Sequence, residues 1–302
     1  MKTTKNLAYS AMIMALIGAF LLVDRLFGSA LLAFLQFLIP LPFAYYTVQH
    51  GNRNGLILLL ATILMSVIVS TIIGIISVAL YGLMGWLYGV FVNRGANRLQ
   101  LLGLSFLVNL VIIIITMFAL GSIMGYGTIA EQVAYLEELM VSTFATFGLE
   151  KALVDKFLKP IFYISTILTA FLEAYLVHTV YLILNMRLKK PLPETMKLSE
   201  VKWPKSSGYI ALLGLLGIVV LPQIQLEPVV EEIGWFITIL ARGYLIFHGI
   251  LFFYRIKNKP IYRKLGFYSI ILVILLPNLL GLPMAILGFL ALVSDLVDRL
   301  SQ

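Results

Sequence analysis

Two ionisable residues lie near the centres of long apolar segments and are the strongest candidates for chemistry in this sequence. Glu173 is central in segment 160–186, and Arg242 is central in segment 232–254. Placing one charged group at the centre of a membrane helix costs about 2.5–3.5 kcal/mol on insertion scales. Both side chains are therefore expected to face the interior of a helix bundle instead of lipid.

The sequence leaves two interpretations of these charges open. The two segments are expected to cross the membrane in the same direction, with Glu173 and Arg242 at depths that differ by only about 4–5 Å. In the first interpretation they form a buried ion pair that fixes helix register. In the second, Glu173, Arg242 and Tyr244 line a polar cavity and are the substrate-binding residues.

The other polar residues within apolar segments are expected to have structural roles and not catalytic ones. Asn109 and Gln36 are expected to form hydrogen bonds between helices, and His178 and His248 to be interior or interfacial histidines. The histidines have no metal-ligand spacing and the chain has no cysteine, so no metal site is predicted. There is also no phosphate-binding GxxxxGK[ST] loop. We therefore expect no cofactor, no catalytic residue and no enzymatic activity.

One enzyme class is a remote alternative. Glu231 and Glu232, followed by Arg242 and His248, resemble the glutamate-rich intramembrane proteases of the CAAX-processing type. Those proteases place the arginine about one helical turn after the glutamate pair. Here the longer separation puts the glutamates at the outer surface and Arg242 near mid-membrane. The further histidine motif expected on another helix is missing as well.

The composition identifies the elements that position these residues as transmembrane helices. Of 302 residues, 61% are hydrophobic and 12% are charged, whereas soluble domains carry about half apolar and about a quarter charged residues. A spanning helix needs about 20 apolar residues. The apolar segments therefore predict an all-α polytopic transmembrane helix bundle of about ten spans, near residues 6–27, 30–49, 55–72, 75–92, 100–121, 160–186, 208–222, 232–254, 262–277 and 280–297. Turn residues divide the two longest apolar segments, 55–92 around Gly74 and 261–297 at Pro277-Asn278 and Gly281-Leu282-Pro283. Pro40 and Pro42 are expected to kink the second span.

The charge distribution predicts the topology. Most of the 22 basic residues fall in alternate loops, and the remaining loops are acidic. By the positive-inside rule the basic loops and both termini are cytoplasmic. The net charge of +8 is thus explained by topology, and no nucleic-acid partner is expected. The chain is therefore predicted to be a multi-pass protein in the lipid bilayer.

One outer segment predicts a helix that does not span. Ile129, Val133, Leu136, Met140 and Phe144 recur at helical spacing within residues 128–158. An amphipathic helix of this kind lies along the membrane interface. It is expected to be an interfacial strut, or alternatively a lid over an outward-facing cavity.

Three local motifs carry a resemblance to a known family: Ile39-Pro40-Leu41-Pro42 leading to His50-Gly51-Asn52-Arg53, Gly85 to Gly89 leading to Asn93-Arg94-Gly95, and Leu287-Gly288 leading to Asp298-Arg299. With the hydropathy layout, they resemble the YybS-like family of bacterial membrane proteins. The resemblance implies a location in the bacterial inner membrane. That family is distantly similar to the S components of energy-coupling factor transporters, compact helix bundles that capture vitamins or metal ions.

The resemblance implies an organisation for the chain and a partner. It implies one integral membrane domain, 1–302, with an S-component-like bundle at 1–186, a basic cytoplasmic loop at 187–207 and additional spans at 208–302. S components dock through small residues of their first helix on a transmembrane coupling subunit that works with ATPases. Ala8, Ala11 and Ala15 have the small-xxx-small spacing that permits close helix contact. The alternative for these alanines is internal packing.

Two functions of different classes follow. The leading interpretation is S-component-like capture or transport of a small-molecule substrate, whose identity the sequence does not specify. The alternative is a non-transporting membrane scaffold or assembly partner that uses the basic cytoplasmic stretches 187–205 and 255–264. A polar cavity at mid-membrane depth favours the first interpretation, and a solidly packed bundle favours the second.

Overall fold

The chain is described by a computed structural model that covers residues 2–119, 131, 134–136, 138, 151–195, 201, 203–224, 226–256 and 260–294. Every regular element within these ranges is a helix, and no β-strand occurs among them. The chain forms two compact units, Met1–Thr195 and Met196–Gln302, which are called unit 1 and unit 2 below. The predicted all-α class is confirmed.

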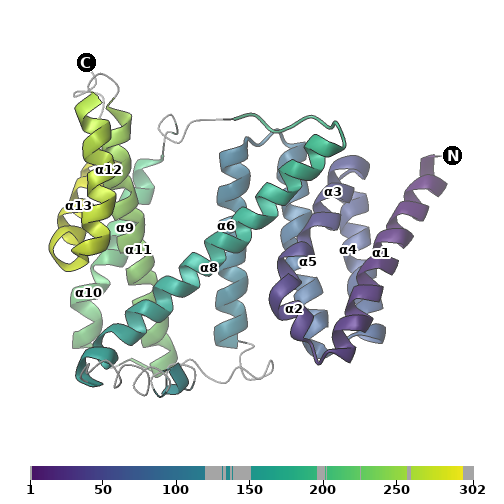
Figure 1. Cartoon of the computed structure of the whole chain (residues 1–302), viewed down its shortest axis with the longest axis horizontal. Coiled ribbons are helices and arrows are strands. Elements are labelled where there is room, and N and C mark those ends of the chain that lie inside the picture. The colour runs from purple at the N-terminus through teal and green to yellow at the C-terminus, as the bar shows by residue number, and fades with distance from the viewer. Residues whose placement is uncertain are drawn as a thin grey trace. The chain divides into compact units, whose positions relative to one another are not determined.

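Unit 1 is a bundle built around a hydrophobic core in which Phe43, Val78 and Leu101 are fully buried. Its elements run from purple to teal in Figure 1. In chain order they are α1 (Lys2–Leu26), α2 (Ala30–Leu35), the 3₁₀-helix η1 (Gln36–Leu38), α3 (Pro40–His50), α4 (Asn52–Val69), α5 (Ile72–Asn93), α6 (Arg98–Ile114), the π-helix η2 (Ile115–Ala119) and α8 (Lys151–Arg187).

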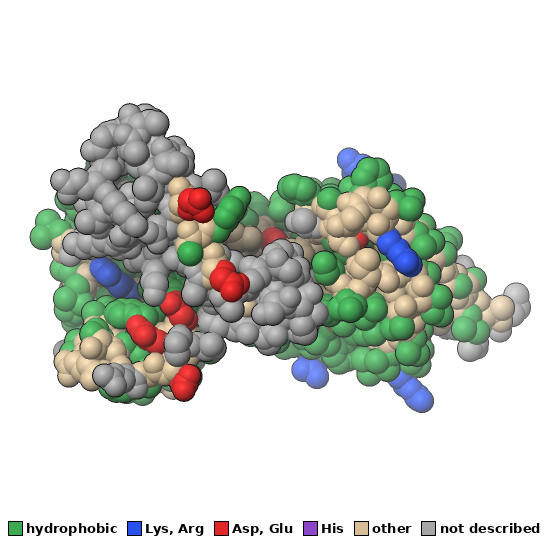
Figure 2. Space-filling model, turned by 90° about the horizontal axis from the view of Figure 1, so that it is seen from below, with side chains coloured by type: hydrophobic (Ala, Val, Ile, Leu, Met, Phe, Trp, Pro, Cys, Tyr) green, Lys and Arg blue, Asp and Glu red, His purple; other side chains and the backbone are tan. Residues whose placement is uncertain are grey.

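The helices have the length and surface that a bilayer requires. Within the described residues, seven helices are long and apolar enough to cross a membrane. Large apolar side chains point outward, with Leu64 71%, Ile68 79% and Leu213 69% exposed, and Figure 2 shows hydrophobic side chains covering much of the displayed face. A helix satisfies its own backbone hydrogen bonds, so it is stable in lipid. The count of about ten spans and the cytoplasmic termini stay predictions.

The predicted second span, 30–49, is divided, and the expectation of one continuous kinked helix was wrong. Helix α2 has 6 residues and α3 has 11, with η1 between them. Pro40 has no N–H to continue the helical bonding, and it occupies the first position of α3, where none is needed. At the other end, the Leu32 N–H donates to Asp24 Oδ1 at 2.8 Å, so Asp24 fixes the start of α2.

Glycines of α5 allow α3 to pack closely against it. A Cβ atom added at Gly85 would collide with the carbonyl oxygen of Pro40, and one added at Gly89 would lie 2.8 Å from the carbonyl oxygen of Ala44. Small residues permit such backbone approach where lipid supplies no hydrophobic force between helices. This contact holds the end of the divided helix against α5.

The predicted division of segment 55–92 around Gly74 was placed a few residues too late. Helix α4 ends at Val69 and α5 begins at Ile72. The break falls at Thr71, whose hydroxyl oxygen accepts a hydrogen bond from the Gly74 N–H at 3.3 Å. Threonine is a favoured N-cap residue, so Gly74 lies in the first turn of α5 and does not make the turn itself.

Unit 2 also contains only helices in its described part. They are α9 (Lys205–Leu215), α10 (Gly217–Val220), the 3₁₀-helix η4 (Leu221–Gln223), α11 (Pro228–Arg255), α12 (Pro260–Leu275) and α13 (Pro277–Val293). Of the two predicted division points in segment 261–297, Pro277 is confirmed, since it is the first residue of α13, whereas Gly281-Leu282-Pro283 lies inside that helix and divides nothing. Helices α11 and α13 cross closely, because a Cβ at Gly249 or Gly288 would collide with the facing backbone.

The predicted outer interfacial helix, 128–158, lies mainly outside the described residues. Glu131, residues 134–136 and Glu138 are helical within it. Its last part was assigned wrongly, because residues 151–158 belong to α8, which continues without a break to Arg187. Whether the rest forms a strut or a lid stays a prediction.

Candidate functional site

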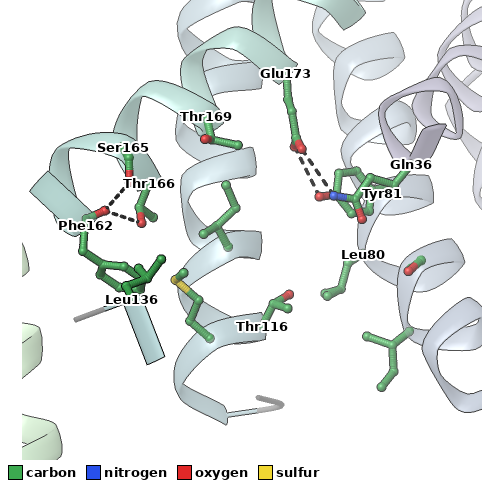
Figure 3. A pocket seen from close by; sticks show the side chains of 14 residues that line it. Gln36, Leu80, Tyr81, Thr116, Leu136, Phe162, Ser165, Thr166, Thr169 and Glu173 are labelled. Atoms are coloured by element: carbon green, nitrogen blue, oxygen red, sulfur yellow. Dashed lines mark hydrogen bonds between the residues drawn. The ribbon is translucent and has the colours of Figure 1, made fainter. Parts of the chain in front are cut away.

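Unit 1 contains a cavity of about 410 Å³. Its walls come from η1, α5, α6 with its π-helical extension, and α8 (Figure 3). Most of the lining surface is apolar, although eight of the fourteen described lining residues carry a polar group: one carboxylate, one amide and six hydroxyls. The lining residues are Gln36, Ile76, Ser77, Leu80, Tyr81, Ile113, Thr116, Met117, Leu136, Phe162, Ser165, Thr166, Thr169 and Glu173.

Helical periodicity explains why these residues share one wall. On α8, the lining positions Phe162, Ser165, Thr166, Thr169 and Glu173 recur every three or four residues, so they form one stripe along the helix. The lining positions of α5 follow the same spacing. The local sequence thus orients each stripe, and the packing of helices from distant parts of the chain brings the stripes together around the cavity.

The Glu173 carboxylate lies in the cavity wall and accepts three hydrogen bonds from three different elements. The Gln36 amide of η1 donates to Oε1 at 3.3 Å, and the Tyr81 hydroxyl of α5 donates to Oε2 at 3.3 Å. The Asn109 amide of α6 donates to Oε2 at 2.9 Å. Figure 3 shows the Gln36 and Tyr81 side chains converging on Glu173. These donors occupy three of the acceptor positions of the carboxylate.

Asn109 also ties the helix that carries Glu173 in place. Its side-chain amide donates a second hydrogen bond to the Ala170 carbonyl oxygen of α8 at 3.1 Å. Asn109 is fully buried, and its Oδ1 atom has no hydrogen-bond partner among the described residues. The expected hydrogen bonds between helices are confirmed for Asn109 and Gln36. The sequence did not predict that both amides donate to Glu173. Their mid-span positions, shared with Glu173, were the one indication that the three could meet.

Hydroxyl groups of α8 that line another part of the wall can still accept hydrogen bonds from a bound molecule. Ser165 and Thr166 both donate to the Phe162 carbonyl oxygen, at 2.8 and 2.9 Å (Figure 3). A hydroxyl that donates to backbone still has oxygen lone pairs for a bound group. The cavity therefore combines a charged region at Glu173 with a neutral polar region one to two turns away along α8.

Arg242 and Tyr244, the other two predicted substrate-binding residues, belong to α11 of unit 2. The Arg242 guanidinium lies beside Gly281, where an added Cβ would be 2.6 Å from an Nη atom. The Tyr244 hydroxyl donates to Ser207 Oγ at 2.8 Å. Glu173 alone of the three lines the unit 1 cavity. The ion pair between Glu173 and Arg242 stays a prediction, as do the binding roles of Arg242 and Tyr244.

The two interior histidines have different surroundings. His178 Nδ1 is hydrogen-bonded to the Tyr88 hydroxyl at 2.8 Å. His248 is fully buried, yet neither of its ring nitrogens has a hydrogen-bond partner in the described structure. It packs instead among aromatic rings, with centroids of Trp203 and Tyr244 at 4.9 and 4.6 Å. The expectation of an interior position is confirmed for both histidines.

The residues considered for proteolysis and for docking do not line this cavity. Glu231 accepts a hydrogen bond from Trp235 Nε1 at 3.3 Å, within the same helix. Among the described residues, no group of three or more His, Cys, Asp or Glu side chains is placed to hold a metal ion. The α1 residues Ala8, Ala11 and Ala15 are exposed, so they do not form the packed interior of unit 1.

Comparison with known proteins gives one family. The family model described as a predicted membrane protein, DUF2232, matches residues 15–290, which is most of the chain. No curated protein matches the sequence. No solved structure matches it either.

Proposed function

We propose that this chain, which belongs to the DUF2232 family of predicted membrane proteins, captures a small solute in the unit 1 cavity beside Glu173. The cavity itself carries the proposal. Its volume of about 410 Å³ falls in the range of about 300–1,000 Å³ that is usual for small-molecule sites. A largely apolar wall with a few convergent polar groups is also typical of such sites. A solidly packed bundle would instead have favoured the scaffold alternative.

The divided helix supports the same proposal. Gln36 lies in η1, between α2 and α3, and its amide is directed at Glu173. In many transporters, helices interrupted within the membrane form the solute site, because irregular backbone is tolerated only where it is buried or lines a cavity. An intramembrane carboxylate also costs about 2.5–3.5 kcal/mol on insertion scales, which makes it a functional-site candidate by default.

The S-component-like role expected from the sequence extends this proposal to a partner. In that role, a transmembrane coupling subunit with ATPases would contact α1. The exposed positions of Ala8, Ala11 and Ala15 support this extension, because small residues on a lipid-facing surface allow a second helix to approach closely. No enzymatic activity is part of the proposal.

The capture of solutes from a cell extract tests the proposed function. The purified protein in lipid nanodiscs is incubated with a metabolite extract and washed, and the retained small molecules are identified by mass spectrometry. Thr169→Trp fills the cavity from α8 and is expected to abolish retention. Leu168→Trp is the matched control, because Leu168 is the adjacent residue, is 53% exposed and does not line the cavity.

The outcomes of this test are distinct. Retention of a metabolite by the wild type and by Leu168→Trp, with loss in Thr169→Trp, supports capture in the cavity. Equal retention by both variants would place the site elsewhere. If the wild type retains no metabolite above empty nanodiscs, the proposed function fails.

A further inference from the structure

We infer that the solute of the unit 1 cavity is an organic monocation, a protonated amine or quaternary ammonium group that carries an apolar body. This inference rests on the proposed function and specifies the substrate class for the same site. It follows from three properties of the cavity: the charge of its wall, the number of acidic groups, and the balance between apolar and polar lining.

The charge of the wall selects a cation. Glu173 accepts hydrogen bonds from Gln36, Tyr81 and Asn109, and all three donors are neutral. None of these donors supplies a positive charge to compensate the carboxylate. In the described part of unit 1, Glu173 therefore leaves a charge of −1 beside the cavity. A cationic solute compensates this charge, whereas an anionic solute is repelled in a region of low dielectric constant.

The number of acidic groups selects a single charge. Among the described lining residues, Glu173 is the only one with a carboxylate. Divalent metal ions are held by several oxygen or nitrogen ligands, and no cluster of three or more such side chains occurs among the described residues. A divalent ion at Glu173 would have too few ligands, and the single carboxylate would neutralise only one of its two charges.

The lining selects an organic cation over a small inorganic one. Ile76, Leu80, Ile113 and Met117 give the cavity an apolar wall that offers nothing to a hydrated ion. The same wall favours burial of an apolar group. Two aromatic residues, Tyr81 and Phe162, also line the cavity, and aromatic faces attract ammonium groups. An ammonium group at Glu173 with an apolar body along the α8 stripe matches both regions.

Matched probes of different charge test the substrate class. The nanodisc protein is titrated with 2-phenylethylammonium, 2-phenylethanol and 3-phenylpropionate, and with butylammonium, butanol and pentanoate, by thermal shift and by native mass spectrometry. The wild type is expected to bind each cation at least about tenfold more tightly than its neutral partner, since the alcohol still donates to the carboxylate but lacks the charge–charge attraction. The anions are expected not to bind.

Two variants assign the preference to Glu173. Glu173→Gln keeps the side-chain size and is expected to remove the preference for cations. Thr169→Lys places an ammonium group one helical turn from Glu173, where it occupies the proposed position and excludes the cationic probes. Leu168→Trp, at an exposed position of α8 that does not line the cavity, is the matched control, and its preference for cations is expected to persist. Thr169→Lys keeps the test decisive if Glu173→Gln does not fold.

The outcomes separate this inference from the proposed function. Preference for cations in the wild type and its loss in Glu173→Gln or Thr169→Lys support the inference. If neutral or anionic probes bind as well as the cations, or if the metabolite retained from extract is neutral, anionic or a metal ion, the inference is overturned and solute capture stands. If the protein binds no probe and retains no metabolite, both fail.

Discussion

Asn109 of α6 and Glu173 of α8 are joined by a hydrogen bond of 2.9 Å, and the same Asn109 amide reaches the Ala170 carbonyl oxygen at 3.1 Å. One buried side chain therefore both holds the two helices together and fixes the position of the cavity carboxylate. Asn109 donates with both of its amide hydrogens, so its structural and electrostatic roles cannot be separated by deleting it.

Replacing Asn109 with leucine is expected to destabilise unit 1. The substitution removes two hydrogen bonds between helices, and such bonds contribute about 1–2 kcal/mol or less in membrane proteins. We expect the free energy of unfolding in detergent to fall by about 1–2 kcal/mol. Leu107→Ala, at a position of α6 that is 60% exposed, is the control and should change stability less. Equal losses in the two variants would show that these hydrogen bonds do not stabilise the bundle.

Replacing Gly85 with leucine is expected to disrupt the packing of α3 on α5. The new Cβ atom would collide with backbone atoms of Pro40, which cannot rotate away as a side chain can. The expected loss is about 3 kcal/mol or more, the upper end for overpacking. Gly103→Leu is the matched control, because a Cβ at Gly103 meets no atom within 4 Å. Similar melting temperatures for both variants would contradict this packing.

A double-mutant cycle tests whether Glu173 and Arg242 form an ion pair. The proposed solute site requires a carboxylate without a permanent cation, so the losses in Glu173→Gln and Arg242→Met should add to within about 0.5 kcal/mol in the double variant. A true buried pair behaves differently, because one truncation leaves the other charge unpaired. Recovery of thermal stability in the double variant would establish the pair and remove the basis for a cationic solute.

The exposed alanines of α1 are expected to serve assembly and not folding. Ala11→Leu with Ala15→Leu should leave the melting temperature within a few degrees of the wild type, since an exposed substitution usually costs less than about 0.5 kcal/mol. The same variant should lose co-purification with a transmembrane partner. Ile17→Ala, at a buried position of α1, is the contrasting control and should lower the melting temperature. Unfolding of the double leucine variant would reassign the alanines to internal packing.

Single cysteines test the predicted topology, since the natural chain has none. Cysteines at Glu137 and Glu231 should react with a membrane-impermeant thiol reagent in intact cells, because the acidic loops are predicted to be outside. Cysteines at Lys197 and Lys257 should react only after the membrane is opened. Labelling of Lys197→Cys in intact cells would contradict the predicted number of crossings.

The sequence by itself determined that this protein is an all-α membrane protein and where most of its helices lie. The reason is that lipid forces each apolar segment to satisfy its own backbone hydrogen bonds, so hydropathy and helix length decide the element. Turn residues predicted a helix boundary correctly at Pro277, because proline has no backbone N–H and is favoured at the start of a helix. They worked less well at Gly74, because glycine is tolerated inside a membrane helix and Thr71 was the actual cap.

Only the tertiary structure decided what Glu173 touches. Hydropathy fixes the depth of a residue in the membrane, but a helix that is apolar all round carries little information about its rotation or its neighbours. Gln36 and Glu173 are 137 positions apart in the chain, and they meet because η1 interrupts a helix that the sequence predicted as continuous. The three donors reach the carboxylate because of how the helices pack. That packing depends on close backbone approach at glycines such as Gly85, which local helix propensity does not predict.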